Sequence, residues 1–396
     1  MAININVQVA RSVPRINDDG LTMVIFKNAQ KATGITDEII SVNTLAELYS
    51  SFDADSSAAA ARELYVAEYL VRAGVNLLCY SVPTVNAGVI DSDDIDAISD
   101  LGVLNYKMLV VPYAFITDGT ATSESLIMKF AKDNDVQLFM DVDPNASASE
   151  VSDIVDALET DNALSPKLEL FINTGLPNFT SEYADLIGAD FGEAGFFGIP
   201  ASAAAVSRKA LLLNSQTPWL PVAGETYGKV NEFTKLHRKL STTEKVDMQA
   251  ENLNVLFTKI GVGNLFVSQN TMLIDEANPA NPLIRSHVVT TALYVKRLLR
   301  RTAEQLLFAP NTIKTWNQFT LKATSLLGRM FDQDGLEDFS VNVGRGITMT
   351  EQDIADGKFK AAITFLPVRV IESITFNIVV QETQDAYVVN FEGGDL

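Results

Sequence analysis

The sequence predicts an α/β fold with a mostly parallel sheet for its N-terminal and middle part, α+β overall, and three observations lead to this prediction. Short, almost continuously apolar runs such as Leu21–Phe26 and Val75–Val82 are typical of strands buried on both faces of a parallel sheet. Between these runs, residues 58–73 carry apolar side chains at helical spacing. Both ends of the chain instead alternate apolar and polar residues, which predicts strands with one solvated face.

The first half of the chain continues this alternation of strands and helices. Thr44 is expected to cap a helix because Glu47 follows at the position that completes a capping box, and Gly74 should end the 58–73 helix. The further strands are predicted at 107–112, 136–142 and 168–172, and the further helices at 123–133, 147–159 and 201–213. Five aspartates between residues 91 and 100 lack the spacing of a calcium loop and predict a solvated acidic turn.

The second half predicts longer helices and a tail that forms sheet. After a loop-rich stretch at 216–243, a helix is expected from 243 toward 255 and a short strand at 265–268. The longest amphipathic helix is predicted at 283–308, and Asn311 should cap a second one at 312–331. Extended structure begins near Phe339.

Apolar residues at alternate positions at the two ends, in a strict pattern at residues 3–9, predict edge strands. The apolar positions are Ile3, Ile5, Val7 and Val9 at the start, Ile374, Phe376, Ile378 and Val380 near the end, and Tyr387, Val389 and Phe391 in the last strand. The polar break 381–385 has no Gly or Pro, so we expect the last strand to be a tail without a tight hairpin. Such strands either close a sheet within their own chain, which is the commoner arrangement, or add to the sheets of neighbouring copies.

Composition limits the classes of function. The 396 residues suggest two or three domains, at roughly 100–200 residues per domain. The formal charge of −20 lies in the first 200 residues, which hold 30 Asp and Glu against 10 Lys and Arg, and an acidic surface opposes binding to nucleic acid. We expect no secretory signal and no membrane insertion, because no run approaches the ~20 apolar residues that span a bilayer. A lone cysteine, Cys79, fits synthesis in a reducing cytoplasm.

Motifs for catalysis are scarce. Two histidines without a cysteine or carboxylate cluster make a zinc site or a Cys–His nucleophile improbable, and the glycine patterns of nucleotide sites are incomplete, so no cofactor, metal or catalytic residue is predicted. The best enzyme candidate is the pair Asp141 and Asp143, since two carboxylates after a parallel strand could hold a metal or substrate. The alternative, which we favour, is that Asp143 caps the turn at Pro144.

An ordered series of short segments from residue 198 onward resembles the contractile tail sheath proteins of phages and phage-tail-like particles. The segments are Gly198–Val206, Pro218–Gly224, Leu253–Leu256, Ser268–Thr271, Arg297–Leu298, Pro310–Thr312, Thr315–Trp316, Gly335–Leu336, Val341, Asp353–Gly357, Leu366–Val368 and Ile371–Ile374. Together they extend over about half the chain, and the 58–82 region is also similar to the N-terminal part of the family. This chain is shorter than many sheaths and lacks their Pro-Gly-Val-Tyr opening.

The resemblance implies a helical homo-oligomer around a tail tube, whose contraction drives the tube through the host envelope without an enzymatic step. It implies an N-terminal arm at 1–20, an outer acidic domain at 21–200, an inner core domain at 201–380 and a C-terminal arm at 381–396. The arms would be donated to neighbours, with Ser373–Gln381 as the recipient strand. The family's inner helices face the tube, which makes three cations candidates for that contact: Lys314, Lys322 and Arg329.

The same resemblance implies the other partners and the location. These are the tube protein, the baseplate and the tail terminator, in the tail of a virion or a tailocin made in a bacterial cytoplasm. Two alternatives stay open from the residues alone: a metal-dependent α/β enzyme that uses Asp141 and Asp143, and a filament protein that assembles without a tube.

Overall fold

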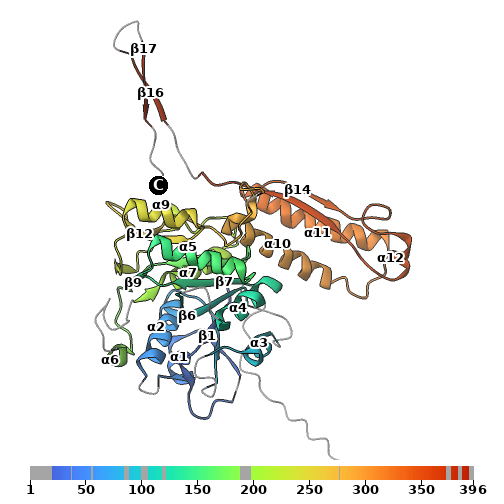
Figure 1. Ribbon diagram of the computed structural model, residues 1–396. Coiled ribbons are helices and arrows are strands. Elements are labelled where there is room, and N and C mark those ends of the chain that lie inside the picture. Colours follow the sequence, from blue (N-terminus) through green and yellow to red (C-terminus); the bar gives the residue numbers. More distant parts are fainter. Residues whose placement is uncertain are drawn as a thin grey trace, which may run out of the picture. The chain divides into compact units, whose positions relative to one another are not determined.

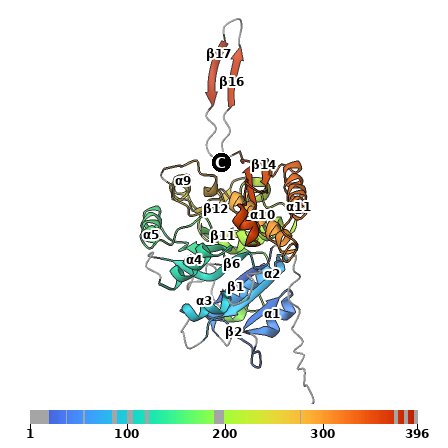
Figure 2. The ribbon, with the colours of Figure 1, turned by 90° about the vertical axis from the view of Figure 1, so that its right-hand side faces the viewer.

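The computed structural model describes residues 20–371, except 37, 55–56, 84–88, 100–105, 118–121, 188–197 and 276, and the strands 376–381 and 386–391. The chain divides into two compact units, Met1–Thr290 (unit 1) and Thr291–Leu396 (unit 2). Figures 1 and 2 show the elements of both. The boundary expected at residue 200 lies inside unit 1, so the compact units follow a different division from the four parts that the resemblance implies, and those parts stay a prediction.

Unit 1 is built on an eight-stranded sheet of order β13-β12-β8-β7-β6-β1-β5-β3. Its strands are β1 (Thr22–Phe26), β3 (Ile39–Val42), β5 (Leu77–Ser81), β6 (Met108–Ile116), β7 (Gln137–Val142), β8 (Leu168–Ile172), β12 (Asn254–Lys259) and β13 (Gly263–Phe266). The six central strands are parallel and the two edge strands, β3 and β13, are antiparallel to their neighbours. The predicted α/β fold with a mostly parallel sheet is therefore confirmed.

Helices connect these strands. They are α1 (Leu45–Ser51), α2 (Ala58–Arg72), α3 (Ser92–Ser99), α4 (Thr122–Asp133), α5 (Ala148–Thr160), α6 (Ala184–Ile187), α7 (Ala201–Asn214), α8 (Gly224–Tyr227) and α9 (Thr242–Ala250). Two small sheets complete the unit, β10-β9-β11 (Ile199–Pro200, Thr174–Pro177 and Phe233–Leu236) and β2-β4 (Gln30–Lys31 and Phe52–Asp53). The capping box of Thr44 and Glu47 is present, and Gly74 follows α2 with a φ of +81° that glycine adopts without strain.

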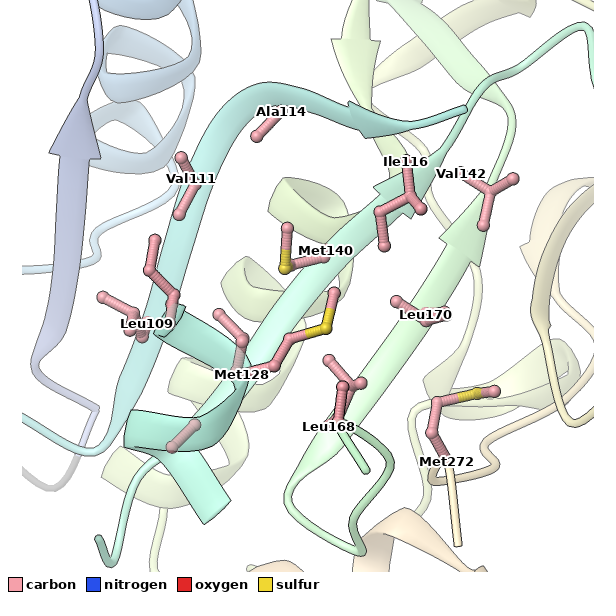
Figure 3. Packing of buried hydrophobic residues seen from close by; sticks show 14 of the residues in the cluster. Leu109, Val111, Ala114, Ile116, Met128, Met140, Val142, Leu168, Leu170 and Met272 are labelled. Carbon is pink, nitrogen blue, oxygen red and sulfur yellow. The ribbon is translucent and has the colours of Figure 1, made fainter. Parts of the chain in front are cut away.

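The core of unit 1 explains the apolar runs of the sequence. Figure 3 shows side chains of β6, β7 and β8 packed together, among them Leu109, Met140 and Leu170, with Met128 of α4 and Met272 beside them. All five are buried. Because burial of one such side chain stabilises a fold by about 1.5–3 kcal/mol, this unit has a large apolar contribution to its own stability.

Two local predictions for unit 1 were wrong. The acidic turn at 91–100 is largely helix α3, because Asp91 accepts hydrogen bonds from the N–H groups of Asp93 and Asp94 and so satisfies the first turn. Asp94 is buried and accepts a hydrogen bond from the Tyr80 hydroxyl at 2.6 Å. The helix expected from 243 toward 255 ends at Ala250, and the segment after it enters the sheet as β12.

Unit 2 contains a helix that packs on a two-stranded ribbon. Helix α10 (Ser286–Glu304) follows a 3-10 turn, η2 (Pro282–Ile284), in unit 1 and runs into unit 2. Then come α11 (Ile313–Asp332), β14 (Leu336–Asn342), α12 (Glu351–Ala355) and β15 (Ala362–Pro367). Phe331 of α11 meets Phe339 of β14 edge to face with ring centroids 6.3 Å apart, and Figure 1 shows the helix along the ribbon.

The helix boundaries in unit 2 differ from the prediction. Helix α10 is shorter than 283–308 at both ends. Thr312, not Asn311, is the N-cap residue of α11, and the Asn311 side chain instead accepts a hydrogen bond from the Trp316 indole at 2.7 Å. The strands β16 (Phe376–Gln381) and β17 (Ala386–Phe391) form a separate antiparallel pair.

Candidate assembly surface

The strands predicted to be exchanged are described only in part. Ile3, Ile5, Val7, Val9 and Ile374 lie outside the described residues. The last strand was expected to be a tail without a tight hairpin, but within one chain β17 pairs with β16 along its whole length.

The register of this pair explains the alternation in the sequence. Phe376 is opposite Phe391, Ile378 is opposite Val389 and Val380 is opposite Tyr387. These six positions therefore share one face of the ribbon. Among the described strands, β16 and β17 pair only with each other, and a lone two-stranded ribbon is marginally stable at best in water.

Unit 2 exposes large apolar side chains. In the described part of the chain, seven large apolar residues are more than 65% exposed, and only Ile260 among them belongs to unit 1. The six in unit 2 are Leu307, Phe308, Ile313, Leu321, Ile347 and Ile371. Among the described residues, the most exposed large apolar side chains are therefore concentrated in the smaller unit.

The core of unit 2 is small. The buried apolar side chains of unit 2, within the described residues, are Leu293, Tyr294, Val295, Trp316, Phe319, Ala323, Leu327, Met330, Leu336 and Met349. A unit of about this size buries a smaller fraction of its surface than a large one and is correspondingly less stable alone. Contacts with a partner would add the apolar burial that the unit itself does not provide.

The exposed face of α11 is cationic. Lys314, Lys322 and Arg329 are all exposed on it, and Lys322 donates a hydrogen bond to the Gln305 side chain at 2.9 Å. From residue 313 to residue 331 the helix has no carboxylate. The three residues predicted to face a tube therefore lie on one exposed cationic helix in a chain whose formal charge is −20.

The carboxylate pair of the enzyme alternative caps backbone groups. Asp141 is buried at the end of β7 and accepts hydrogen bonds from the N–H of Ser202, at 3.0 Å, and from its hydroxyl. Helix α7 has no side-chain cap of its own because Pro200 holds its N-cap position, so Asp141 takes that role. Burial raises the pKa of Asp141 to about 7, and the two bonds from Ser202 oppose this rise. Asp143 accepts from the Asn145 N–H at 2.8 Å in the turn that follows.

Protein groups also occupy the C-terminal end of β1, where an α/β enzyme would hold its substrate. The Glu63 carboxylate accepts hydrogen bonds from the N–H groups of Lys27, Asn28 and Ala29, at 2.9–3.2 Å. Burial raises the pKa of Glu63, and these bonds oppose the rise. Among the residues that the structure describes, no group of three or more His, Cys, Asp or Glu could hold a metal ion. In the described ranges, no helix combines the length and the apolar character that crossing a membrane requires.

Solved structures of contractile sheath proteins share the fold of this chain. The contracted helical sheath of the anti-feeding prophage aligns with a TM-score of 0.67 at 17% sequence identity, over 97% of this chain and 100% of the other. The contracted sheath complex of PVC, an extracellular contractile injection system, aligns with a TM-score of 0.63 at 18% identity, over 97% of each chain. A sheath tail protein from Desulfitobacterium hafniense aligns with a TM-score of 0.56 at 10% identity, over 98% of this chain and 99% of the other.

The chain has the contractile-sheath fold. The resemblance noted from short segments of the sequence is thereby confirmed at the level of the fold. No protein-family model and no curated protein sequence matches the chain.

Two features of this sheath fold were not identified from the sequence. The first is the exposed turn at Leu307 and Phe308, which was assigned to the end of a long amphipathic helix. Pro310 was the available signal, because the residue before a proline, here Ala309, is biased away from helix, which favours a helix end ahead of it.

The second feature is a buried polar network at the N-terminal end of α10. Lys209 of α7 donates to Glu169 of β8 at 2.7 Å, and Ser286, the first residue of α10, donates to the same carboxylate oxygen at 2.7 Å. All three side chains are buried, and burial lowers the pKa of Lys209 while Glu169 opposes that shift. No spacing in the sequence relates these residues, which lie on three different elements.

Proposed function

We propose that this chain is the structural subunit of a contractile sheath, which polymerises helically around a tail tube and contracts to drive the tube through a cell envelope. The observation that supports this most is the shared fold over 97% of this chain with sheaths in their contracted state. The exposed apolar surface of unit 2 supports it independently, because that surface suits a protein that is covered by partners in its working form. The role is structural and not enzymatic, and the described carboxylates at the ends of β1 and β7 already bind backbone groups.

In the proposed assembly, subunits are joined by exchanged strands. The arms would be the apolar positions of residues 3–9 and 387–391, and the recipient would be the strand at 374–380. The β16–β17 pairing within one chain gives the register that an exchanged strand would use, in which 386–391 complements 376–381. The same ladder formed with the tail of a neighbour would be a domain swap, in which identical contacts are made between copies and not within one.

The other partners follow from the same proposal. The tube protein would contact the exposed cations of α11, and the ends of the sheath would contact the baseplate and the tail terminator. The particle would be a phage tail or a phage-tail-like injection device, with its subunits made in a bacterial cytoplasm. The cationic face of α11 would suit an acidic tube surface and a contact that breaks easily on contraction, because exposed ion pairs contribute little each.

Electron microscopy of the purified chain tests the proposal. Hollow striated tubes are expected from the intact chain, and tubes should be lost from a chain that lacks residues 387–396. Addition of a tube protein should order the polymers around it, whereas filaments that ignore a tube protein would favour the tube-less alternative. Monodisperse monomers from both chains, at concentrations where sheaths assemble, would refute the proposed function.

A further inference from the structure

Unit 2 has two unlike ends. The first, called here the apolar tip, consists of Leu307, Phe308, Ile313 and Ile347, all more than 65% exposed. The second, called here the acidic end, consists of Asp332, Asp334, Glu337 and Asp338, all exposed, with the exposed apolar side chains of Phe331 and Leu366 beside them. The 20 residues of α11 separate the two ends by about 30 Å, at 1.5 Å of rise per residue.

Hydrogen bonds hold the parts of the apolar tip together. The Asn311 side chain donates to the Lys358 carbonyl at 3.2 Å, which places the 344–360 segment beside the start of α11. Within that segment the Thr348 hydroxyl donates to the Lys360 carbonyl at 2.7 Å and fixes the loop that carries Ile347. Figure 1 shows α12, from this segment, at the end of the unit where α11 begins.

Phe308 is the most exposed residue of the apolar tip. Its ring is fully exposed and its φ of +65° is a conformation that bulky side chains rarely adopt. Two hydrogen bonds hold the turn. The Ala309 N–H donates to the Leu306 carbonyl at 3.0 Å, and the Thr315 hydroxyl donates to the Pro310 carbonyl at 2.6 Å. Backbone strain of this kind persists where the surrounding structure fixes it and occurs preferentially at functional positions.

The charges of the two ends are complementary. Residues 300–322 and 344–360, which form the tip, together hold seven Lys or Arg and four Asp or Glu, whereas residues 329–338 and 362–369, at the acidic end, hold two Arg and four Asp or Glu. A tip that faces a second tip would bring cations together, and two acidic ends would bring carboxylates together. Only the pairing of unlike ends places opposite charges around an apolar contact, and such complementarity selects the orientation of partners.

We propose that the apolar tip of unit 2 docks on the acidic end of unit 2 in the next copy of the chain, head to tail. Phe308 and Leu307 make the apolar centre of the contact, against Phe331 and Leu366 of the next copy. A heterologous contact of this kind repeats without closing unless its rotation closes a ring. The inference rests on the proposed function, since it specifies how copies of the sheath subunit contact one another in addition to any exchanged strands.

Cysteine cross-linking tests the orientation of the contact. Cys79 is the only cysteine and is buried, so the parent chain gives the background. Ala309→Cys marks the tip and Gln333→Cys marks the acidic end, and both positions are exposed without belonging to the proposed contact. A short bis-maleimide is added to the full-length chain under assembly conditions, and products are separated by denaturing electrophoresis.

Head-to-tail docking predicts a ladder of multimers from the double variant. Each single variant should stay monomeric, and an equal mixture of the two should give dimers only. Adding Phe308→Ser to the double variant should reduce the ladder by about tenfold or more, as expected for the loss of an aromatic anchor. Ile260→Ser, which removes an equally exposed apolar residue of unit 1, should leave the ladder unchanged.

The other outcomes overturn the inference. Dimers from Ala309→Cys alone would mean that two tips meet, and the absence of a ladder would mean that the ends do not meet. The proposed function fails separately, because hollow tubes without a ladder would support a sheath and refute this contact. A ladder without tubes would support this contact and refute the sheath.

Discussion

Replacement of Asp141 by alanine separates its capping role from a catalytic one. The substitution leaves the N–H and the hydroxyl of Ser202 without their buried acceptor, and an unsatisfied buried group costs about 1–3 kcal/mol. The substitution also removes a carboxylate that burial disfavours in its ionised form. At about pH 5, where the folded state still holds this carboxyl protonated, we therefore expect a net loss of about 2 kcal/mol in the free energy of unfolding of unit 1. Asp143→Ala removes one bond at a half-buried turn and should cost about half as much.

Cys79 provides an assay that reports on unit 1 alone. It is the only thiol, it lies in β5 and it is fully buried, so a thiol reagent modifies it only when unit 1 opens. A loss of 2 kcal/mol should raise the labelling rate about 30-fold under conditions where opening is at equilibrium. Equal rates for wild type and Asp141→Ala, or an effect of Asp143→Ala as large as that of Asp141→Ala, would refute the capping argument. Assembly should survive both substitutions at temperatures where unit 1 stays folded.

Three further outcomes are expected. Since the pKa of Asp141 is about 7 when folded and 3.8 is its ordinary value, its contribution to stability is complete below about pH 4 and is lost as the pH rises to about 7. The urea midpoint of unfolding, followed by circular dichroism, should therefore fall less between about pH 4 and pH 7 in Asp141→Asn than in the wild type. An equal fall in both proteins would contradict a raised pKa of Asp141. Lys209→Met should cost about 3–5 kcal/mol because Glu169 is left buried without its cation. Adding Glu169→Leu should restore much of the lost stability. If the double variant recovers none of it, the cost of Lys209→Met does not come from the unpaired Glu169 carboxylate. Charge reversal of the three exposed cations of α11 should weaken co-sedimentation with a tube protein and reduce its salt dependence. Reversal of the half-buried Lys129 in unit 1, which pairs with Asp161 at 3.2 Å, should not weaken co-sedimentation, and equal effects of the two changes would argue against a tube contact by α11.

The fold of unit 1 could be predicted closely because each signal was local. The runs Leu21–Phe26 and Val75–Val82 are buried strands, and the caps at Thr44 and Gly74 determine helix ends by hydrogen bonds within a few residues. The acidic stretch at 91–100 was misjudged because the burial of Asp94 depends on the distant Tyr80 hydroxyl. Composition alone gives no sign of such a partner.

The candidate surface was less predictable, because exposure too depends on residues that are distant in the sequence. The cations of α11 were candidates because the resemblance implies that the inner helices face a tube, whereas the exposed turn at Leu307 and Phe308 fitted the pattern of the predicted amphipathic helix. Apolar residues in a sequence are assigned by default to a core, and whether they are covered depends on packing between elements. The buried Lys209–Glu169 pair was equally hidden, because it joins α7 to β8.

In the proposed assembly, the contrast between the two units indicates where the free energy of assembly would arise. Unit 1 buries long apolar strands, and its buried Lys209 and Glu169 pair with each other. Unit 2 keeps Leu307, Phe308 and Leu321 in water over a small core. At about 25 cal/mol per Å² of apolar area, each few hundred Å² that a tighter lattice buries in unit 2 would contribute about 5–10 kcal/mol per copy. Repeated along a polymer, that difference would drive contraction without hydrolysis, provided that the subunits stay connected while the contacts of unit 2 are exchanged.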